Sequence, residues 1–195
     1  IGVMIIVMGI VFSGGPQAIS RLALSDNTYQ GELLIREAQI QGSAINSVSG
    51  LFGGSGVYFN RATATQMLKF KDRVIIDPTR AINIGDGLYK TMPIDEVENI
   101  TKLTNKNVIG KLCVATSSTD RLYCNDDPSL TVNTLTVSFT RPKQIAHIYI
   151  NDSTSTDYAI ACIQFDAFRS PEPGFVKSLF VYKSGMITKK ARTCL

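Results

Sequence analysis

The hydrophobic and polar positions divide the chain into an apolar start, a long helical stretch and a β-rich remainder. Residues 1–12 carry no polar side chain. As a helix they would rise about 18 Å at ~1.5 Å per residue, short of the ~30 Å hydrocarbon core of a bilayer. This apolar arm therefore suits a signal-peptide core, a buried helix or a truncated membrane segment. No Met or basic residue precedes it, so we expect a processed chain or one without its first residues.

A breaker and then a second helical segment follow the arm. Glycine is flexible and proline lacks an amide hydrogen, so the breaker predicts a kinked or melted turn at Ser13, Gly14, Gly15 and Pro16. Residues 17–48 have apolar side chains mostly three, four or seven positions apart, which predicts an amphipathic helix. Its predicted core-facing stripe is Ile19, Leu22, Tyr29, Leu33, Leu34, Ala38, Ile40, Ala44, Ile45 and Val48. The glycines from Gly50 onward predict its end.

Beyond the helix the apolar positions alternate, which is typical of half-buried β-strands. The clearest case is residues 133–140, where Leu135, Val137 and Phe139 share one face and hydroxyl groups the other. Further strands are predicted at residues 56–59, 66–70, 73–76, 108–114, 145–150, 158–165 and 175–182. A turn at residues 183–185 then leads into a terminal hairpin strand at 186–188, and residues 77–93 read as a surface loop.

These patterns predict an α+β fold in which a long protruding N-terminal helix packs on an antiparallel β-sheet domain. The helical spine covers residues 1–50, made of the arm at 1–12 and the amphipathic half at 17–48, and the β-rich head covers 51–195. A spine of about 48 residues would be roughly 70 Å long, so it must extend beyond the domain. One sheet face should pack on the spine and the other should face water.

Composition adds a size limit but no partner. The chain has 195 residues, 44% hydrophobic and 18% charged, which suits one domain with an appendage and excludes disorder as a whole. The net charge of +4 is not gathered into a long basic run. Four basic residues near the carboxyl end are either a phosphate-attracting cluster or an ordinary solvated edge. They are Lys183, Lys189, Lys190 and Arg192.

The four cysteines, Cys113, Cys124, Cys162 and Cys194, lack C-x-x-C spacing, which argues against zinc. Their even number in a polar region predicts disulfides made in an oxidising compartment, with buried reduced thiols as the alternative. Three pairings are possible. A predicted hairpin around residues 116–120 favours Cys113 with Cys124, and Cys162 with Cys194 then follows by elimination.

Enzymatic readings find little support in the residues. His147 is the only histidine, and a lone histidine in a strand is more often a packing or surface residue than a catalytic base. The loop residues Asp77, Asn83, Asp86 and Asp95 lack the spacing of a calcium loop and read as a solvated acidic loop. We therefore predict a protein that is not an enzyme, with no catalytic residue, cofactor or metal.

An apolar N-terminal helix, a Gly and Pro break, an amphipathic continuation and a β domain together resemble type IV pilins and pseudopilins. The likeness is greatest to general-secretion pseudopilin H, on the phrase Leu-Ile-Arg-Glu-Ala-Gln at residues 34–39, Gly-Val-Tyr-Phe at 56–59 and the hydrophobic hairpin at 180–187. The family's cleavage site, its exposed aromatic residue and its glutamate would lie just upstream of Ile1.

The resemblance implies a structural subunit of a type IV pilus or pilus-like filament, serving adhesion or twitching motility at the cell surface. Its partners would be other copies in a helical homopolymer, the pilus assembly machinery of the inner membrane, and a host or neighbouring cell surface. Before assembly it would reside in the inner membrane. The assembly residues would be Ile1, Val3, Met4, Ile5, Ile6, Val7, Met8, Ile10, Val11 and Phe12. The alternative is a minor pseudopilin of a secretion or DNA-uptake system whose basic tail binds DNA.

Overall fold

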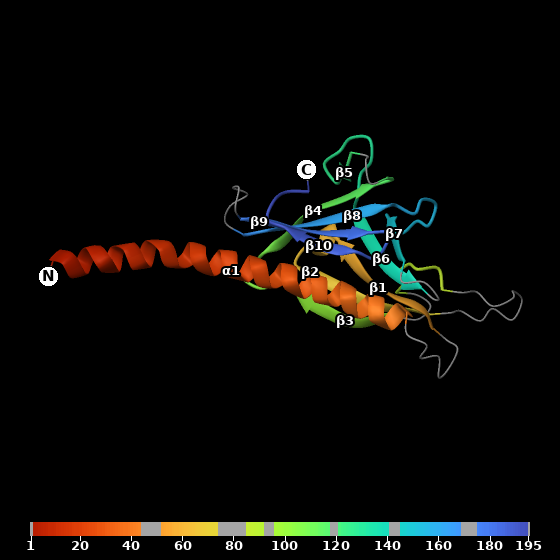
Figure 1. Ribbon diagram of the computed structural model, residues 1–195, viewed down its shortest axis with the longest axis horizontal. Coiled ribbons are helices and arrows are strands. Elements are labelled where there is room, and N and C mark those ends of the chain that lie inside the picture. The colour runs from red at the N-terminus through yellow and green to blue at the C-terminus, as the bar shows by residue number, and fades with distance from the viewer. Residues whose placement is uncertain are drawn as a thin grey trace, which may run out of the picture.

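The computed structural model describes residues 2–43, 52–73, 85–91, 96–117, 121–140, 145–168 and 175–194, with the side chains of residues 2–17, 52 and 73 left out. In these ranges one long helix is followed by a β-rich domain (Figure 1). The elements are α1 (Gly2–Ser43), β1 (Phe52–Asn60), the 3-10 helix η1 (Arg61–Thr63), β2 (Gln66–Arg73), β3 (Val97–Lys102), β4 (Val108–Ala115), β5 (Tyr123–Cys124), β6 (Thr134–Thr140), β7 (Ala146–Ile150), β8 (Ile160–Asp166), β9 (Val176–Tyr182) and β10 (Ile187–Lys190).

The strands form two antiparallel five-stranded sheets, so the prediction of a helix packed on one sheet is wrong. Sheet A has the order β3-β2-β1-β6-β7, and sheet B has the order β10-β9-β8-β4-β5. The chain leaves sheet A after β3, builds β4 and β5 of sheet B, and returns to sheet A for β6 and β7. Alternation along a strand identifies which residues share a face, but it does not say which strands pair, so the sequence could not separate two sheets from one.

The predicted melting of the helix at residues 13–16 is also wrong. The helical backbone of α1 runs without interruption from Gly2 to Ser43, through Ser13, Gly14, Gly15 and Pro16. A proline removes one helical hydrogen bond and each glycine lowers helix propensity by ~1 kcal/mol, but these penalties are local and helical bonding continues on both sides. The predicted end of the helix near residue 48 lies outside the described residues.

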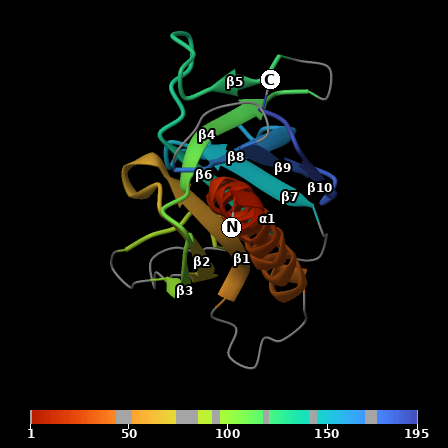
Figure 2. The same cartoon turned by 90° about the vertical axis from the view of Figure 1, so that its left-hand side faces the viewer.

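The second half of α1 packs against both sheets, on β1 and β6 of sheet A and on β8 and β9 of sheet B (Figures 1 and 2). Its buried apolar side chains are Leu24, Leu34, Ile35 and Ala38. Of the predicted core-facing stripe, Leu34 and Ala38 are buried, whereas Ile19, Leu22, Tyr29, Leu33 and Ile40 are exposed, and Ala44, Ile45 and Val48 lie outside the described residues. The helix has apolar residues on two faces, and the predicted stripe combined residues of both.

One hydrophobic core joins the helix to the inner faces of both sheets. Phe59 and Phe139 of sheet A, Phe165 and Leu179 of sheet B, and Ile35 of α1 belong to the same buried cluster. Burial of this apolar surface is the main favourable contribution to folding. Since the cluster spans both sheets and the helix, the three layers stabilise one another.

The outer face of sheet A is not wet as predicted. Thr134, Thr136 and Ser138 of β6 are buried. Residues 85–91, a segment of the predicted surface loop, lie over this face, where Gly87 donates its amide hydrogen to Asp72 Oδ2 at 2.8 Å. A Cβ atom on Gly87 would lie 2.9 Å from Ser138 Oγ. The loop segment therefore belongs to the folded domain.

Candidate functional site

Glycines let α1 approach both sheets closely. A Cβ atom at Gly31 would lie 3.2 Å from Phe165 Cζ of sheet B and 3.3 Å from Met67 Sδ of sheet A. At Gly42 it would lie 2.3 Å from the carbonyl oxygen of Phe139. The sequence thus places residues without side chains where the helix touches strands, and this fixes the direction in which the rest of α1 leaves the domain.

Polar contacts then align α1 with the β9–β10 hairpin. Lys177 Nζ donates to Ser25 Oγ at 2.7 Å, and Gln39 Nε2 donates to the carbonyl oxygen of Gly185 at 3.2 Å. Between them Lys189 Nζ lies 2.6 Å from Glu32 Oε2. Since a helix rises ~1.5 Å per residue, these bonds hold the hairpin along about 20 Å of the helix.

We call the line of contact between α1 and the β9–β10 hairpin the seam. Glu32 pairs with two cations along it. Its carboxylate also binds Arg36, with 2.8 Å between Arg36 Nη2 and Glu32 Oε1. The hydrogen bond from Lys189, followed by that from Arg36, lowers the pKa of Glu32 against the opposing effect of burial. The Lys189 ammonium also lies 5.0 Å from the centroid of the Tyr29 ring. Both contacts hold the Lys189 side chain against α1.

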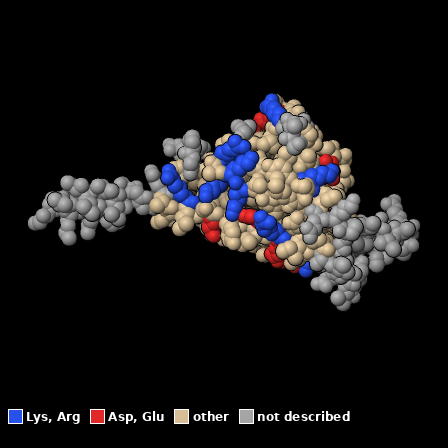
Figure 3. Space-filling model, in the orientation of Figure 1, with Lys and Arg blue, Asp and Glu red and all other residues tan. Residues whose placement is uncertain are grey.

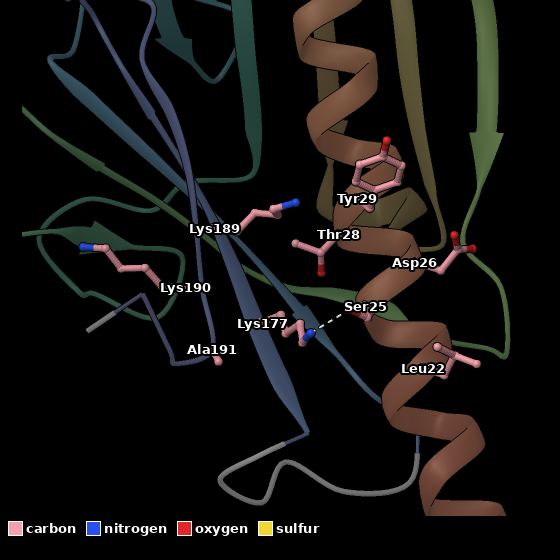
Figure 4. Close-up of a pocket in the computed structure, with 9 residues that line it drawn as sticks. All are labelled: Leu22, Ser25, Asp26, Thr28, Tyr29, Lys177, Lys189, Lys190 and Ala191. Carbon is pink, nitrogen blue, oxygen red and sulfur yellow. Dashed lines mark hydrogen bonds between the residues drawn. The ribbon is translucent and has the colours of Figure 1, made fainter.

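A groove of about 500 Å³ opens between α1 and the β9–β10 hairpin (Figure 4). It is lined by Leu22, Ser25, Asp26, Thr28, Tyr29, Lys177, Lys189, Lys190 and Ala191. In Figure 4, Lys177 and Lys189 point toward the helix, and Lys190 points away from it. At the end of the seam nearer the amino terminus, the Arg21 guanidinium lies 4.9 Å from the centroid of the Phe175 ring.

The four basic residues singled out in the sequence do not form one patch. Lys183 lies at the β9–β10 turn, with its Nζ 2.9 Å from Asp157 Oδ2. Lys189 binds Glu32, and Lys190 Nζ lies 4.4 Å from the centroid of the Phe180 ring. Arg192 lies in the tail, where its carbonyl oxygen accepts a hydrogen bond from Ser178 Oγ. The sequence did not single out Arg21 and Lys177. Contacts between distant segments bring them to the seam, and such contacts leave no local pattern in the sequence.

The predicted disulfide pairing is confirmed. Cys113 bonds Cys124 across the β4–β5 hairpin, and Cys162 on β8 bonds Cys194 in the tail. All four sulfurs belong to a second hydrophobic cluster. With Phe180 and Ile160, this cluster covers sheet B on the side away from α1.

His147 and the described part of the predicted acidic loop make contacts within the domain. His147 Nδ1 lies 3.3 Å from Asp157 Oδ2, and Asp157 Oδ1 accepts the amide hydrogen of Ile148 at 3.0 Å. In the predicted acidic loop, Asp86 forms an ion pair with Lys90, and Asp77, Asn83 and Asp95 lie outside the described residues. Within the ranges that the structure describes, no group of three or more His, Cys, Asp or Glu side chains is placed to hold a metal ion.

The predicted assembly residues of the arm have helical backbone from Gly2 onward, and their side chains are not among those described. Where residues are described, no helix is both long enough and apolar enough to cross a bilayer. Comparison with known proteins gives no match to a protein-family model, to a curated protein or to a solved structure.

Proposed function

We propose that this chain is a structural subunit of a type IV pilus or pilus-like filament that polymerises through its apolar N-terminal helix. The filament would be displayed at the cell surface for adhesion or motility, and its subunits would wait in the inner membrane before the assembly machinery takes them up. The proposal rests on the resemblance of residues 34–39, 56–59 and 180–187 to pseudopilins, and on the geometry of α1.

The observation that carries the proposal is that the two halves of α1 have different surroundings. This helix has 42 residues, far more than the ~11 or 12 of an ordinary globular helix. Its second half is embedded against both sheets, and its first half projects from the domain (Figure 1). The projecting half begins with the apolar arm. Apolar residues on all sides of a helix require a partner, and a bundle of identical arms or a bilayer supplies one.

Open-ended growth follows from the shape of such a subunit. In a bundle of identical arms, the face that one arm presents and the face of the next arm that it contacts would be different patches. A contact between different patches is heterologous, and when its rotation does not close it generates a helical filament. The embedded half of α1 transmits the position of the arm to the β domain, so that contacts between arms set the spacing of the domains.

The test is a charge in the arm. Val7→Asp would place a carboxylate among packed apolar helices at a cost of several kcal/mol, while leaving the β domain folded. Val7→Leu is the matched control because it keeps the position apolar. We expect filaments in sheared fractions of the control, seen by electron microscopy, and none in Val7→Asp. Normal filament numbers in Val7→Asp would refute the proposal.

A DNA-uptake subunit remains the second candidate. It is favoured by Lys190 and Arg192, which have no carboxylate partner among the described residues. It is weakened by Lys183 and Lys189, since both are held by carboxylates. Salt-dependent binding of duplex DNA that is lost in Lys190→Gln/Arg192→Gln and kept in Lys183→Gln would support this function.

A further inference from the structure

Over most of the domain each cation has a carboxylate partner. Lys69 lies between Glu37 and Glu98, and Lys183 binds Asp157. Further pairs among the described residues join Lys71 to Glu98, Lys90 to Asp86, Lys111 to Asp126 and Arg121 to Asp127. These cations contribute little net positive field to the surface around them.

The cations without a carboxylate partner among the described residues gather elsewhere. They are Arg21, Arg61, Lys102, Lys106, Lys177, Lys190 and Arg192. We call this set the basic end. Arg21 and Lys106 lie over the rings of Phe175 and Phe168, which leaves their charge unneutralised.

Long-range contacts place the basic end where α1 leaves the domain. Thr104, in the turn that joins β3 to β4, donates its amide hydrogen to Asn27 Oδ1 at 2.9 Å, so Lys102 and Lys106 lie near this level of the helix. Lys177 binds Ser25 on the sheet B side, and Ser178, beside Lys177, is the register partner of Lys190. Figure 3 shows Lys and Arg gathered at this end of the domain, next to the projecting helix.

We propose that the basic end docks on the phosphate groups of an anionic phospholipid surface while the arm is inserted in the bilayer. This inference rests on the proposed function, because it takes the arm to be in the membrane before assembly. Beyond the proposed function, the β domain itself contacts the headgroups, through unpaired Lys and Arg side chains that belong to both sheets and to α1.

The arrangement fits a plane crossed by the helix. The cations lie on two sides of α1, with Lys177 and Lys190 in sheet B and Arg61 and Lys102 beside sheet A. When α1 points into a bilayer, the cations on both of these sides of the helix face the lipid headgroups. A rigid nucleic acid duplex laid across the same surface would meet the projecting helix.

The distances along the helix also fit. From Phe12, the last residue of the arm, to Arg21 the helix rises about 14 Å at ~1.5 Å per residue. The polar region of one leaflet takes up roughly 5 to 7 Å of this rise. Long Lys and Arg side chains and a Debye length of about 8 Å at physiological salt cover the remainder. Arg21 is therefore within electrostatic reach of lipid phosphates. Lys177 is also within reach, because it binds Ser25, one helical turn beyond Arg21.

The test compares partitioning of the full chain onto phosphatidylcholine vesicles with and without phosphatidylglycerol. The arm gives binding that is independent of lipid charge, and the basic end adds binding that requires phosphatidylglycerol. Each cation near an anionic surface contributes roughly five-fold at low salt, so Lys177→Gln/Lys190→Gln/Arg192→Gln should lose roughly 100-fold of the phosphatidylglycerol preference. The control Lys111→Gln/Arg121→Gln/Lys183→Gln has the same net charge and should keep that preference.

Each other outcome would overturn the docking. These outcomes are equal binding of the wild-type chain to both vesicles, equal losses in the two triple variants, and tighter binding to duplex DNA than to the anionic vesicles at the same salt. Release by inorganic phosphate beyond that by sodium chloride of equal ionic strength would assign the surface to free phosphate. Failure of the arm is seen separately, as loss of binding to pure phosphatidylcholine vesicles.

Discussion

Cys113 on β4 and Cys162 on β8 are directly opposite each other in sheet B, so the two disulfides are neighbours. Each central cysteine is bonded away from the other, Cys113 to the β5 strand and Cys162 to the tail. The four sulfurs thus form a row across the outer face of the sheet, where one thiol freed by mutation would have a disulfide beside it.

Removing the two disulfides should have unequal effects on stability. The Cys162–Cys194 bridge spans 32 residues and the Cys113–Cys124 bridge 11. On the chain-entropy scale they contribute about 4 and about 3 kcal/mol, respectively. We therefore expect Cys162→Ser/Cys194→Ser to lower the urea midpoint more than Cys113→Ser/Cys124→Ser, and to make the tail protease-sensitive near Lys189 and Lys190. A larger loss from the shorter bridge would contradict this order.

A single substitution should instead rearrange the bridges. In Cys194→Ser, the Cys162 thiolate can attack Cys113 Sγ, forming a Cys113–Cys162 bond and releasing Cys124 as the thiolate. We expect non-reducing peptide mapping to recover this crosslink with Cys124 free. Cys124→Ser is the mirror control, since its freed Cys113 thiolate attacks Cys162 and releases Cys194. An intact Cys113–Cys124 bridge with Cys162 as the free thiol would show that exchange does not occur.

Asp72 should make the domain less stable as the pH rises. Burial, reinforced by Glu96 and Asp86, raises the pKa of its carboxyl from 3.8 to about 7, against the hydrogen bond from Gly87. A raised pKa means that the folded state holds the proton more tightly than the unfolded state. Its contribution is therefore full below pH ~4 and is lost as the pH rises to about 7.

Asp72→Asn tests this linkage, because the amide keeps an acceptor for Gly87 and carries no charge. We expect the variant to be more stable than the wild type at pH 8, with a smaller difference at pH 5, in urea unfolding at both pH values. Asp126→Asn is the control, since Asp126 is exposed, is paired with Lys111 and does not contribute to the pKa of Asp72. A variant that is less stable than the wild type at pH 8 would show that Asp72 is not destabilising when ionised.

Gly31 and Gly42 of α1 should respond differently to alanine. Alanine gains about 1 kcal/mol in helix propensity over glycine. At Gly42 the new Cβ would meet the backbone of β6, which cannot move without disturbing its pairs with β1 and β7, so we expect a net loss of about 1 to 3 kcal/mol. At Gly31 it would meet the ends of Phe165 and Met67, which can shift, so the loss should be smaller. Thermal unfolding of both variants gives the comparison.

The sequence predicted most strands from local alternation and the Cys113–Cys124 disulfide from hairpin proximity, and the Cys162–Cys194 disulfide followed by elimination. Residues 108–114, 133–140 and 175–182 each match a strand within a few positions. The strand β3 was missed, because most of its side chains are exposed and its sequence has no apolar alternation. The division into two sheets was missed because pairing between distant strands leaves no period in the sequence.

The side of the helix that faces the core was assigned only partly correctly, for a related reason. Asn27, Thr28 and Glu32 lie on the buried face. Polar residues are more often exposed, but each of these three has a hydrogen-bond or ion-pair partner. Asn27 bonds Thr104, and Thr28 Oγ1 donates to the carbonyl oxygen of Leu24 at 2.8 Å. Asn27 and Glu32 have partners in distant segments, Thr104 and Lys189, and the helical period of the sequence cannot indicate such partners.

The bonds that align α1 with the domain also determine how the molecule would bear tension. Ser25, Glu32 and Gln39 are tied to β9, β10 and their turn, and Glu37 is tied to Lys69 of sheet A. A pull on the projecting helix, directed along its axis, would load these attachments and the apolar contacts between them in shear, all at the same time. Rupture would require them to fail together, whereas a strand peeled from the edge of a sheet loses its hydrogen bonds in succession.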